Sequence, residues 1–462
     1  MTGLDPGRLA PPEGFRRTAR RLECAGFEAW GVGGSLRDTF VLQLLGDTVA
    51  NPPEWDLATD ARPDEVMELF RRTVPVGVSH GTVRVLDGDE HVEVTTFRRD
   101  VETDGRHARV VFASSIEEDL GRRDFTVNAI AWRPASGHVR DPYGGLADIE
   151  SGILRAVGDP GARFREDYLR VLRGFRFAGR FGWAVEPGTD EALREAVDGL
   201  AVLSAERVRE ELMKVLGDPN PSAGLDLYAT RGALAHWYPE LLGLAADRGA
   251  WLAALGAVDA VPAQELKVRL ARLVVSAADT PEGRAEVAEA LLSRLRFSNA
   301  DRRHVTRLSR LFLPFVGPTD SAAEHRRWLA SAGEAWEDVF ALHFAGARAE
   351  EAERAEQAER YLEATRERVR QEWLDEPPLS LADLAVRGDD LLELGMSPGP
   401  LVRLLLEELL EQVLEDPGRN DRARLLGEAG RLIEMGVLTE ASRPGGGSGG
   451  PPAGDEPLGS DA

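Results

Sequence analysis

The chain has 462 residues, of which 43% are hydrophobic and 29% are charged, and its formal net charge is −23. This length allows two to four domains with their own cores, and the composition is that of an ordinary soluble protein. No apolar run approaches the roughly 20 residues of a membrane helix, and the start, "MTGLDPGRLAPPEGF", has no signal pattern. We therefore expect a cytoplasmic protein that contacts no membrane. The single cysteine, Cys24, excludes an internal disulfide and a metal cage built from cysteines.

The negative net charge taken alone argues against a nucleic-acid partner. The type of positively charged side chain and its position along the sequence change that inference. Lys214 and Lys267 are the only lysines, so nearly all positive charge is carried by arginine, whose planar fork suits phosphates and base edges. Arginine clusters recur between Arg98 and Arg209, whereas the acidic excess lies near the C-terminal end, as in "AEEAERAEQAER".

The first part of the chain, residues 12–157, has short strand-like runs separated by turn residues and a few helices. These runs are "FEAWGVGG", "GTVRVLD", "HVEVTTF", "RVVFAS", "NAIAWRP" and "ILRAVGD". They predict a mixed α/β domain, which we call the head.

After residue 160 the strand signal disappears and amphipathic helices follow one another, which predicts an α+β protein with an all-α remainder. We divide the remainder into a neck (158–240), a body (241–375) and a tail (376–443). The last stretch, 444–462, is rich in Gly and Pro without apolar anchors and is expected to be disordered.

The segment "WGVGGSLRDTFVLQLL" reads as a strand, a turn at Gly33 and Gly34, and a helix. Such a turn leaves backbone N–H groups bare at a helix N-terminus, where a phosphate is favoured. A Gly-Gly pair alone is more often a plain joint between a strand and a helix. The following residues favour the phosphate site.

Three carboxylates lie near that turn in the predicted sheet. Glu54 and Asp56, in "PPEWDLAT", would project to one face of an extended segment, and Glu93 lies in the neighbouring run "HVEVTTFRRD". Carboxylates on one face repel each other unless a cation lies between them, and Mg²⁺ is the usual answer. Taken singly, each acid is more typical of a solvated surface residue, but the three together predict a site for a pair of Mg²⁺ ions.

Together these motifs resemble the class II tRNA nucleotidyltransferases and bacterial poly(A) polymerases, within the DNA polymerase β-like nucleotidyltransferase superfamily. "GGSLRD" with "EWDLATDARPDEV" is similar to the metal-binding motif of the family, and "DLGRRDFTVNAIA" to the motif that joins head and neck. "DPYGGLADIESGILRAVGDPGARFREDYLRVLRGFRFAGRFGW" and "LSAERVREELMKVL" resemble the later motifs. The resemblance covers about residues 25–240 closely and the rest loosely. Glu54 departs from the pattern, because the family usually has Asp there.

The resemblance implies a polymerase β-like catalytic head and a role for each motif. Glu54 and Asp56 would hold two Mg²⁺ ions, with Glu93 as the third catalytic carboxylate, while RNA attacks a nucleoside triphosphate. Gly33, Gly34, Arg37 and Arg122 would contact the triphosphate. The tail would bind tRNA.

The base-reading residues are expected in "FREDYLRVLRGFRF", where Asp167, Arg170, Arg173 and Arg176 follow at i, i+3 intervals along one predicted helix. Asp accepts from an exocyclic amine and Arg donates to ring acceptors, which suits the edges of C and A. The resemblance implies that Asp167 and Arg170 read the incoming CTP or ATP. The plain alternative is an Asp–Arg ion pair on a helix. Lys214, in the later motif, is expected to pair with Glu210.

Several activities occur in this family, and the sequence favours one. "VGVSHGTVRVLDG" lacks the basic stretch of poly(A) polymerases, and the C-terminal part is acidic, which favours tRNA. The loop "DVETDGRHARVVF" has its full length, which favours full CCA addition from CTP and ATP over CC addition. Addition of the terminal A alone stays open, an inactive RNA-binding homologue is a remote alternative, and the oligomeric state is left open.

Overall fold

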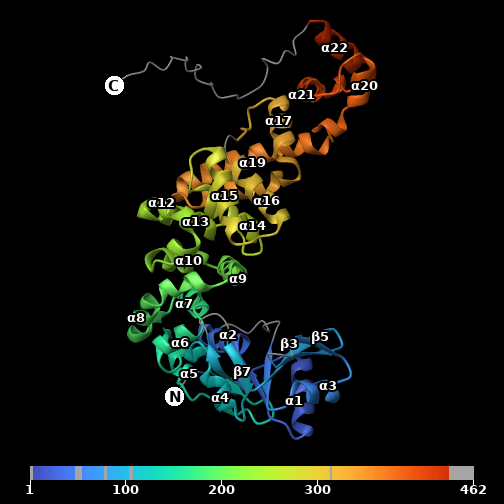
Figure 1. Cartoon of the computed structure of the whole chain (residues 1–462). Helices are drawn as coiled ribbons and strands as arrows, with labels where there is room; N and C mark the ends of the chain where they lie inside the picture. The colour runs from blue at the N-terminus through green and yellow to red at the C-terminus, as the bar shows by residue number, and fades with distance from the viewer. Residues whose placement is uncertain (1–3, 47–54, 78–80, 104–107, 313–314, 436–462) are drawn as a thin grey trace, which may run out of the picture. The chain divides into compact units, whose positions relative to one another are not determined.

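The computed structural model describes residues 4–46, 55–77, 81–103, 108–312 and 315–435, drawn in colour in Figure 1. Glu54 and the segment 444–462, expected to be disordered, lie outside these residues. The chain divides into two compact units. Unit 1 comprises the described parts of Met1–Leu313 and Asp338–Ala358, and unit 2 those of Pro314–Glu337 and Glu359–Ala462.

A seven-stranded mixed sheet forms the centre of the described head, in the order β3-β4-β5-β2-β1-β8-β9. Its strands are β1 (Ala29–Val32), β2 (Asp56–Thr59), β3 (Thr73–Gly77), β4 (Thr82–Asp87), β5 (Glu90–Thr96), β8 (Ala131–Trp132) and β9 (Val139–Arg140). β2 and β5 run parallel, and their register places Asp56 opposite Glu93. The other neighbours run antiparallel, with Val32 opposite Asp56.

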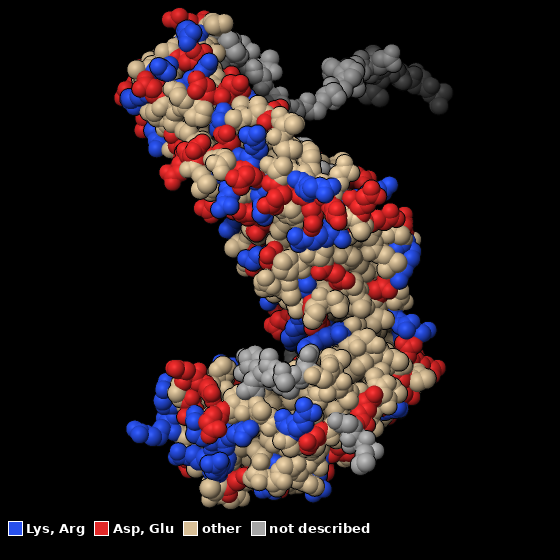
Figure 2. All heavy atoms as spheres, turned by 180° about the vertical axis from the view of Figure 1, so that it is seen from behind, with Lys and Arg blue, Asp and Glu red and all other residues tan. Residues whose placement is uncertain are grey.

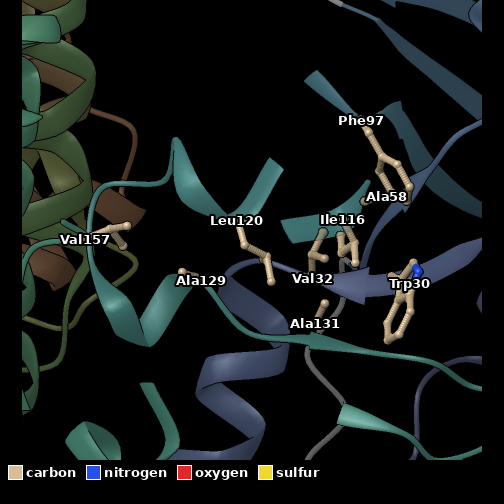
Figure 3. Packing of buried hydrophobic residues seen from close by; sticks show 9 residues of the cluster. All are labelled: Trp30, Val32, Ala58, Phe97, Ile116, Leu120, Ala129, Ala131 and Val157. Carbon is tan, nitrogen blue, oxygen red and sulfur yellow. The ribbon is translucent and has the colours of Figure 1, made fainter. Parts of the chain in front are cut away.

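The two faces of this sheet have different neighbours, because side chains alternate along each strand. On one face, helix α1 (Glu13–Cys24) packs against β1, β2 and β5, and the ring of Phe15 lies 5.3 Å from that of Trp55. On the other face, Trp30, Val32 and Ala58 pack with Ile116 and Leu120 of helix α4 (Ile116–Gly121). Figure 3 shows this second cluster, which also includes Phe97, Ala129, Ala131 and Val157. The carboxylates of Asp56 and Glu93 belong to this second face.

Further short elements complete the head. The strands β6 (Arg98–Thr103) and β7 (Ala108–Phe112) form a separate two-stranded antiparallel sheet. They include most of the segment "DVETDGRHARVVF", which the sequence analysis treated as a loop. The other elements are α2 (Gly34–Leu45), α3 (Pro63–Leu69) and α5 (Gly145–Ser151). β3, β6 and β9 were not among the predicted strand-like runs. We expected no strand after residue 160, but the structure has one there. It is β11 (Ala184–Val185), which pairs in parallel with β10 (Ile153–Leu154).

The rest of unit 1 is otherwise helical, as predicted. The neck contains α6 (Pro160–Glu166), α7 (Leu169–Phe181), α8 (Pro187–Glu195), α9 (Ala205–Gly217), α10 (Pro221–Thr230) and α11 (Leu234–Trp237). The body part contains α12 (Leu242–Ala246), α13 (Arg248–Asp259), α14 (Leu266–Val275), α15 (Pro281–Arg294), α16 (Asn299–Leu311) and most of α18 (Trp336–Arg348). α7 and α10 touch at their glycines: a Cβ added at Gly179 would lie 2.3 Å from the backbone N of Gly224.

Unit 2 has its own core. It comprises α17 (Ala322–Ala332), most of α19 (Ala352–Leu374), α20 (Gly388–Glu393), α21 (Pro400–Glu415) and α22 (Arg422–Glu434). Leu391, Leu405, Leu409, Val413 and Leu425 form its buried centre. The chain thus has the predicted α+β arrangement, while the bounds of neck, body and tail stay a prediction.

None of the described helices is by itself both long and apolar enough to span a bilayer. One pair of helices bent by 115°, Pro239–Ala246 and Arg248–Asp259, meets the criterion of length and composition jointly.

Candidate active site

A cavity of about 590 Å³ lies between the sheet and the first neck helices. Every predicted site residue that the structure describes lines it: Gly33, Gly34, Arg37, Asp56, Glu93, Arg122, Asp167, Arg170, Arg173 and Arg176. Eight arginines and five carboxylates are among the described lining residues. The cavity is therefore rich in cations although the chain is acidic.

The turn between β1 and α2 brings backbone close to a carboxylate. Gly33 has φ 86° and ψ −155°, and a Cβ added there would lie 2.7 Å from Oδ2 of Asp56. Only glycine combines this backbone conformation with this close approach. The N–H groups at the start of α2 lie at the lip of the cavity, which suits a phosphate.

The carboxylates of Asp56 and Glu93 are register partners on β2 and β5 and line the same cavity. Glu93 accepts a hydrogen bond of 2.6 Å from Arg84, and both side chains keep 37% of their surface exposed. Glu54, the third carboxylate, lies outside the described residues. Within the described ranges, no three His, Cys, Asp or Glu side chains are grouped so that they could hold a metal ion.

Two arginines follow helix α4 and converge on one buried carboxylate. Arg122 and Arg123 each lie 3.1 Å from Asp119, whose side chain is 2% exposed. Burial alone would raise the pKa of Asp119, but the two guanidinium groups outweigh it and lower that pKa. Asp119 thus orients a pair of cations at the wall of the cavity.

Arg37 lines the cavity from α2, but its guanidinium is largely engaged. It donates to Asn128 and, over 2.8 Å, to Asp38, and it lies 4.6 Å from the ring centroid of Phe177. Burial lowers the pKa of Arg37 against the opposing effect of Asp38. These contacts fix the orientation of the side chain that was predicted to touch the triphosphate.

Asp167 is not on the helix of the three arginines, contrary to the expectation that the four residues share one helix. It follows α6 in extended conformation, and α7 begins at Leu169, whose N–H donates to Asp167 over 3.1 Å. Its other carboxylate oxygen accepts a bond of 2.6 Å from Arg207 of α9. The alternative considered from the sequence was an ion pair between Asp167 and an arginine of the same helix. Asp167 does form an ion pair, but its partner, Arg207, belongs to another helix.

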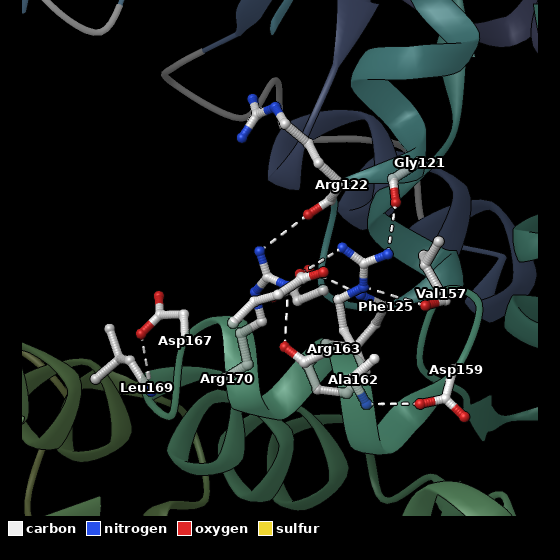
Figure 4. A network of polar contacts seen from close by, with 12 residues as sticks. Gly121, Arg122, Phe125, Val157, Asp159, Ala162, Arg163, Asp167, Leu169 and Arg170 are labelled. Atoms are coloured by element: carbon white, nitrogen blue, oxygen red, sulfur yellow. Dashed lines mark hydrogen bonds and ion pairs between the residues drawn. The ribbon is translucent and has the colours of Figure 1, made fainter. Parts of the chain in front are cut away.

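Arg170 belongs to a network that joins the neck to the head, drawn in Figure 4. Its guanidinium donates to Glu166 over 2.6 Å and to the carbonyl of Arg122 over 3.0 Å. Arg163 donates to the same carboxylate over 2.7 Å and to the carbonyl of Gly121 over 2.8 Å. Glu166 thus holds both arginines on the segment that carries Arg122.

The two further arginines of α7 pair with buried acids. Arg173 lies 2.7 Å from Asp124; burial would raise the pKa of this acid, but Arg173 and Asn128 outweigh it and lower it. Arg176 lies 2.5 Å from Glu211, and both side chains are under 10% exposed. Lys214 lies 3.7 Å from Glu211, so the expectation that Glu210 is its partner was wrong.

Several cavity residues were not singled out from the sequence. They are Asp119, Arg123, Asp124, Asn128 and Arg207. The first four lie in or next to "DLGRRDFTVNAIA" and the last in "LSAERVREE", so the motifs contained them. Only the tertiary contacts distinguish them from their motif neighbours.

Three family descriptions match successive parts of the chain. Residues 29–155 match a poly(A) polymerase head domain, 182–243 a probable RNA- and SrmB-binding site of polymerase A, and 281–429 a putative tRNA nucleotidyltransferase domain 2. A CCA-adding enzyme of Geobacillus stearothermophilus is 33% identical over 418 residues, which cover 88% of this chain and 93% of the relative. The chain belongs to the CCA-adding enzyme family. This result confirms the predicted family and its nucleotidyltransferase class.

Other relatives match over shorter or more distant alignments. CCA-adding enzymes of Leuconostoc mesenteroides and Lactiplantibacillus plantarum are each 45% identical to this chain. The aligned region covers 47% and 46% of this chain, respectively, and 53% of each relative, which is about half of its length. The crystal structure of the Bacillus stearothermophilus CCA-adding enzyme in complex with CTP is similar with a TM-score of 0.73 and 30% identity. It covers 93% of this chain and 99% of that one, which confirms the α+β fold with a nucleotidyltransferase head.

Proposed function

We propose that this chain adds CCA to the 3′ end of tRNA, using CTP and ATP and releasing pyrophosphate without a nucleic-acid template. The proposal rests on one observation above the others: the cavity gathers the described members of the predicted phosphate-binding, carboxylate and base-reading sets in one place. Membership of the CCA-adding family adds support.

The reaction requires a polar, cationic cavity next to carboxylates. The 3′ oxygen of the RNA would bond to the α-phosphorus, the bond from that phosphorus to the bridging oxygen would break, and pyrophosphate would leave with those electrons while the hydroxyl proton is released. The start of α2 and Arg122 would bind the triphosphate, and Arg37 would be held beside it by Asn128 and Asp38.

Divalent metals are in general use in this family, and the donor set here is compatible with Mg²⁺. Asp56 and Glu93 supply the hard oxygen ligands that Mg²⁺ prefers, on adjacent strands of one cavity. We infer that Asp56 and Glu54 would hold the ions, with Glu93 beside them. Bound there, Mg²⁺ would lower the pKa of the RNA hydroxyl and neutralise the triphosphate.

Asp167 and Arg170 would choose the base. The carboxylate of Asp167 is fixed by Arg207 and by the N–H of Leu169, so an amino group of C or A would meet an oriented acceptor. Arg170 would supply the donor once its contacts with Glu166 and the carbonyl of Arg122 admit the base.

The direct test supplies CTP and ATP separately to tRNA transcripts that end before CC, after C and after CC. We expect CMP to be added to the first two and AMP only to the third. AMP addition alone would identify an enzyme for the terminal A, repeated AMP addition to unrelated RNA a poly(A) polymerase, and no incorporation an inactive homologue.

The matched variant for this test is Asp56→Ala. It should abolish incorporation while leaving the thermal midpoint and tRNA binding nearly unchanged, because it removes a metal ligand from the cavity. More than a few per cent of residual activity would contradict the role given to Asp56.

A further inference from the structure

The carboxylate of Asp38 lies between two arginines that belong to different helices. Its Oδ1 accepts a hydrogen bond of 2.8 Å from Nε of Arg37, whose Nη2 lies 2.6 Å from the same oxygen. Its Oδ2 accepts a hydrogen bond of 3.0 Å from Arg180. Arg37 and Asp38 lie in helix α2 of the head, whereas Arg180 lies in the last turn of α7 in the neck. One carboxylate therefore connects the arginine predicted to contact the triphosphate with the helix that carries the predicted base-reading arginines.

This contact differs from an ordinary ion pair on the surface. Figure 2 shows that Lys and Arg lie next to Asp and Glu over much of the face it presents, and exposed pairs of this kind stabilise a protein little. The side chain of Arg37, in contrast, is only 5% exposed, and that of Asp38 is 24% exposed. A buried guanidinium depends on its partner far more, because it has lost the water that would otherwise solvate it.

The charges around Arg37 are otherwise positive. Burial lowers the pKa of Arg37, the neighbouring Arg180 and Arg176 lower it further, and Asp38 acts in the opposite direction. No other carboxylate of the described residues forms an ion pair with Arg37. Without Asp38, the guanidinium would keep the amide oxygen of Asn128 as its acceptor, but the repulsion by the two arginines would be unopposed. Asp38 thus keeps Arg37 in place beside the cavity.

Helix α7 also contacts Arg37 with aromatic side chains. The guanidinium carbon lies 4.6 Å from the ring centroid of Phe177 and 5.2 Å from that of Phe181. Both rings and Arg180 belong to the C-terminal half of α7. Arg170 lies near the other end of this helix, about 15 Å along the axis from Arg180 at ~1.5 Å per residue. Because a helix of this length moves as a rigid element, the contacts of Arg37 also position Arg170.

We propose that Asp38 is a positioning residue for the incoming nucleotide: it aims Arg37 at the β- and γ-phosphates and, through Arg180, holds α7 at a fixed distance from them. Asp38 is not among the described residues that line the catalytic cavity, so it acts through the two arginines and not by touching the nucleotide. The inference rests on the proposed function, which places Arg37 beside the triphosphate. It links the reading of the base and the binding of the phosphates through one carboxylate.

The first test compares the binding of CTP and of CMP to the full chain and to Asp38→Asn, by calorimetry without tRNA. The substitution keeps the shape of the side chain but removes its charge. We expect the affinity for CTP to fall at least tenfold, and that for CMP, which lacks the β- and γ-phosphates, to fall less than twofold. An equal loss for both ligands would mean that Asp38 only supports the fold, and it would overturn the proposal.

The link to α7 is tested with Arg180→Met, which keeps the apolar stem but removes the guanidinium. Asp218→Asn is the matched control, because Asp218 is the other acidic partner of Arg180, at 3.5 Å. Burial raises the pKa of Asp218 to about 6 against the opposing effect of Arg180, so a neutral side chain is tolerated there. We expect the affinity for CTP to fall at least threefold in Arg180→Met and to stay unchanged in Asp218→Asn. Equal effects in the two variants would overturn the link to α7.

The double variant D38N/R180M shows whether the two side chains act through one contact. Its affinity for CTP should lie within about twofold of that of Asp38→Asn, because Arg180 has already lost the charge of its partner. Losses that multiply would mean that Arg180 acts independently of Asp38, and they would overturn the shared role.

Addition of CMP to tRNA ending before CC by the unchanged chain separates two kinds of failure. If the unchanged chain adds CMP and Asp38→Asn keeps the same preference for CTP over CMP, this inference alone is wrong. If the unchanged chain neither adds CMP nor prefers CTP over CMP, the proposed function is wrong and this inference fails with it.

Discussion

The arginines of the cavity differ in how deeply their acidic partners are buried. Arg176 is buried with Glu211, whereas Arg170 donates to carbonyls and to a partly exposed acid. The predicted grouping by sequence interval placed both in one base-reading set. Their partners separate them, because a buried pair cannot easily release its cation to a substrate.

The role of Asp167 can be tested by the loss of selectivity. Asp167→Ala removes the acceptor for the amino group of C and A, so the carbonyls of UTP and GTP are no longer repelled. We expect discrimination against UTP and GTP to fall by about 1–3 kcal/mol, the scale of one good base contact. Kinetics with all four nucleotides on tRNA ending before CC measure this change.

Arg207→Ala is the matched variant for Asp167, because it removes the partner but keeps the carboxylate. Selectivity should fall less than in Asp167→Ala. An equal loss of rate for all four nucleotides in Asp167→Ala, at unchanged selectivity, would mean that the residue only supports the start of α7.

Glu211 provides a second test at the level of one side chain. Glu211→Ala would leave the guanidinium of Arg176 buried without its 2.5 Å partner, and the free energy of unfolding should fall by about 3–5 kcal/mol. Lys214→Ala removes the exposed partner of the same carboxylate and should cost under about 1 kcal/mol. Urea denaturation of both variants compares the two, and similar losses would contradict the importance assigned to the buried pair.

Among the structural elements, α7 and α10 are positioned by a glycine contact. A Cβ at Gly179 would lie 2.3 Å from the backbone of Gly224, where no side chain can move aside. Gly179→Ala should therefore destabilise the neck by about 1–3 kcal/mol, despite the gain in helix propensity. Gly243→Ala in α12 is the control, because a Cβ there meets nothing within 4 Å. A thermal midpoint that rises in both variants would refute the close contact.

The elements also explain how far sequence reasoning reaches. The run "HVEVTTF" predicted β5 through the alternation of its side chains, and "FEAWGVGG" predicted β1 as a short run before a turn, because both are local signals. The break between α6 and α7 at Asp167 contains no Gly or Pro, so the sequence has no helix-breaking residue that would predict it. At the break, Asp167 accepts a hydrogen bond from Arg207, which lies 40 residues away and could not be paired with it from the sequence. Part of the cavity lining was predicted through motifs, while the remaining lining residues, such as Asp119 and Arg207, required the tertiary structure.

For the whole molecule, the net charge of −23 would repel RNA, whereas the proposed function requires RNA to bind. They are reconciled by position, because the described cavity gathers eight arginines while acidic side chains are spread over the helices. Electrostatic attraction of a polyanion depends on the local field at the site and less on the sum of all charges. The net charge of the whole chain mainly affects its solubility.

This view predicts that tRNA binding weakens as salt increases although the protein is acidic. The slope of log K against log salt should be negative, with a magnitude of ~0.7–0.9 for each phosphate contacted, because counterions are released from the RNA. Filter binding of tRNA between low and moderate salt measures it, and truncation of residues 444–462 should change neither the slope nor the rate. An affinity that is flat or rises with salt would mean that the repulsion summed over the whole chain dominates the local attraction of the arginine clusters.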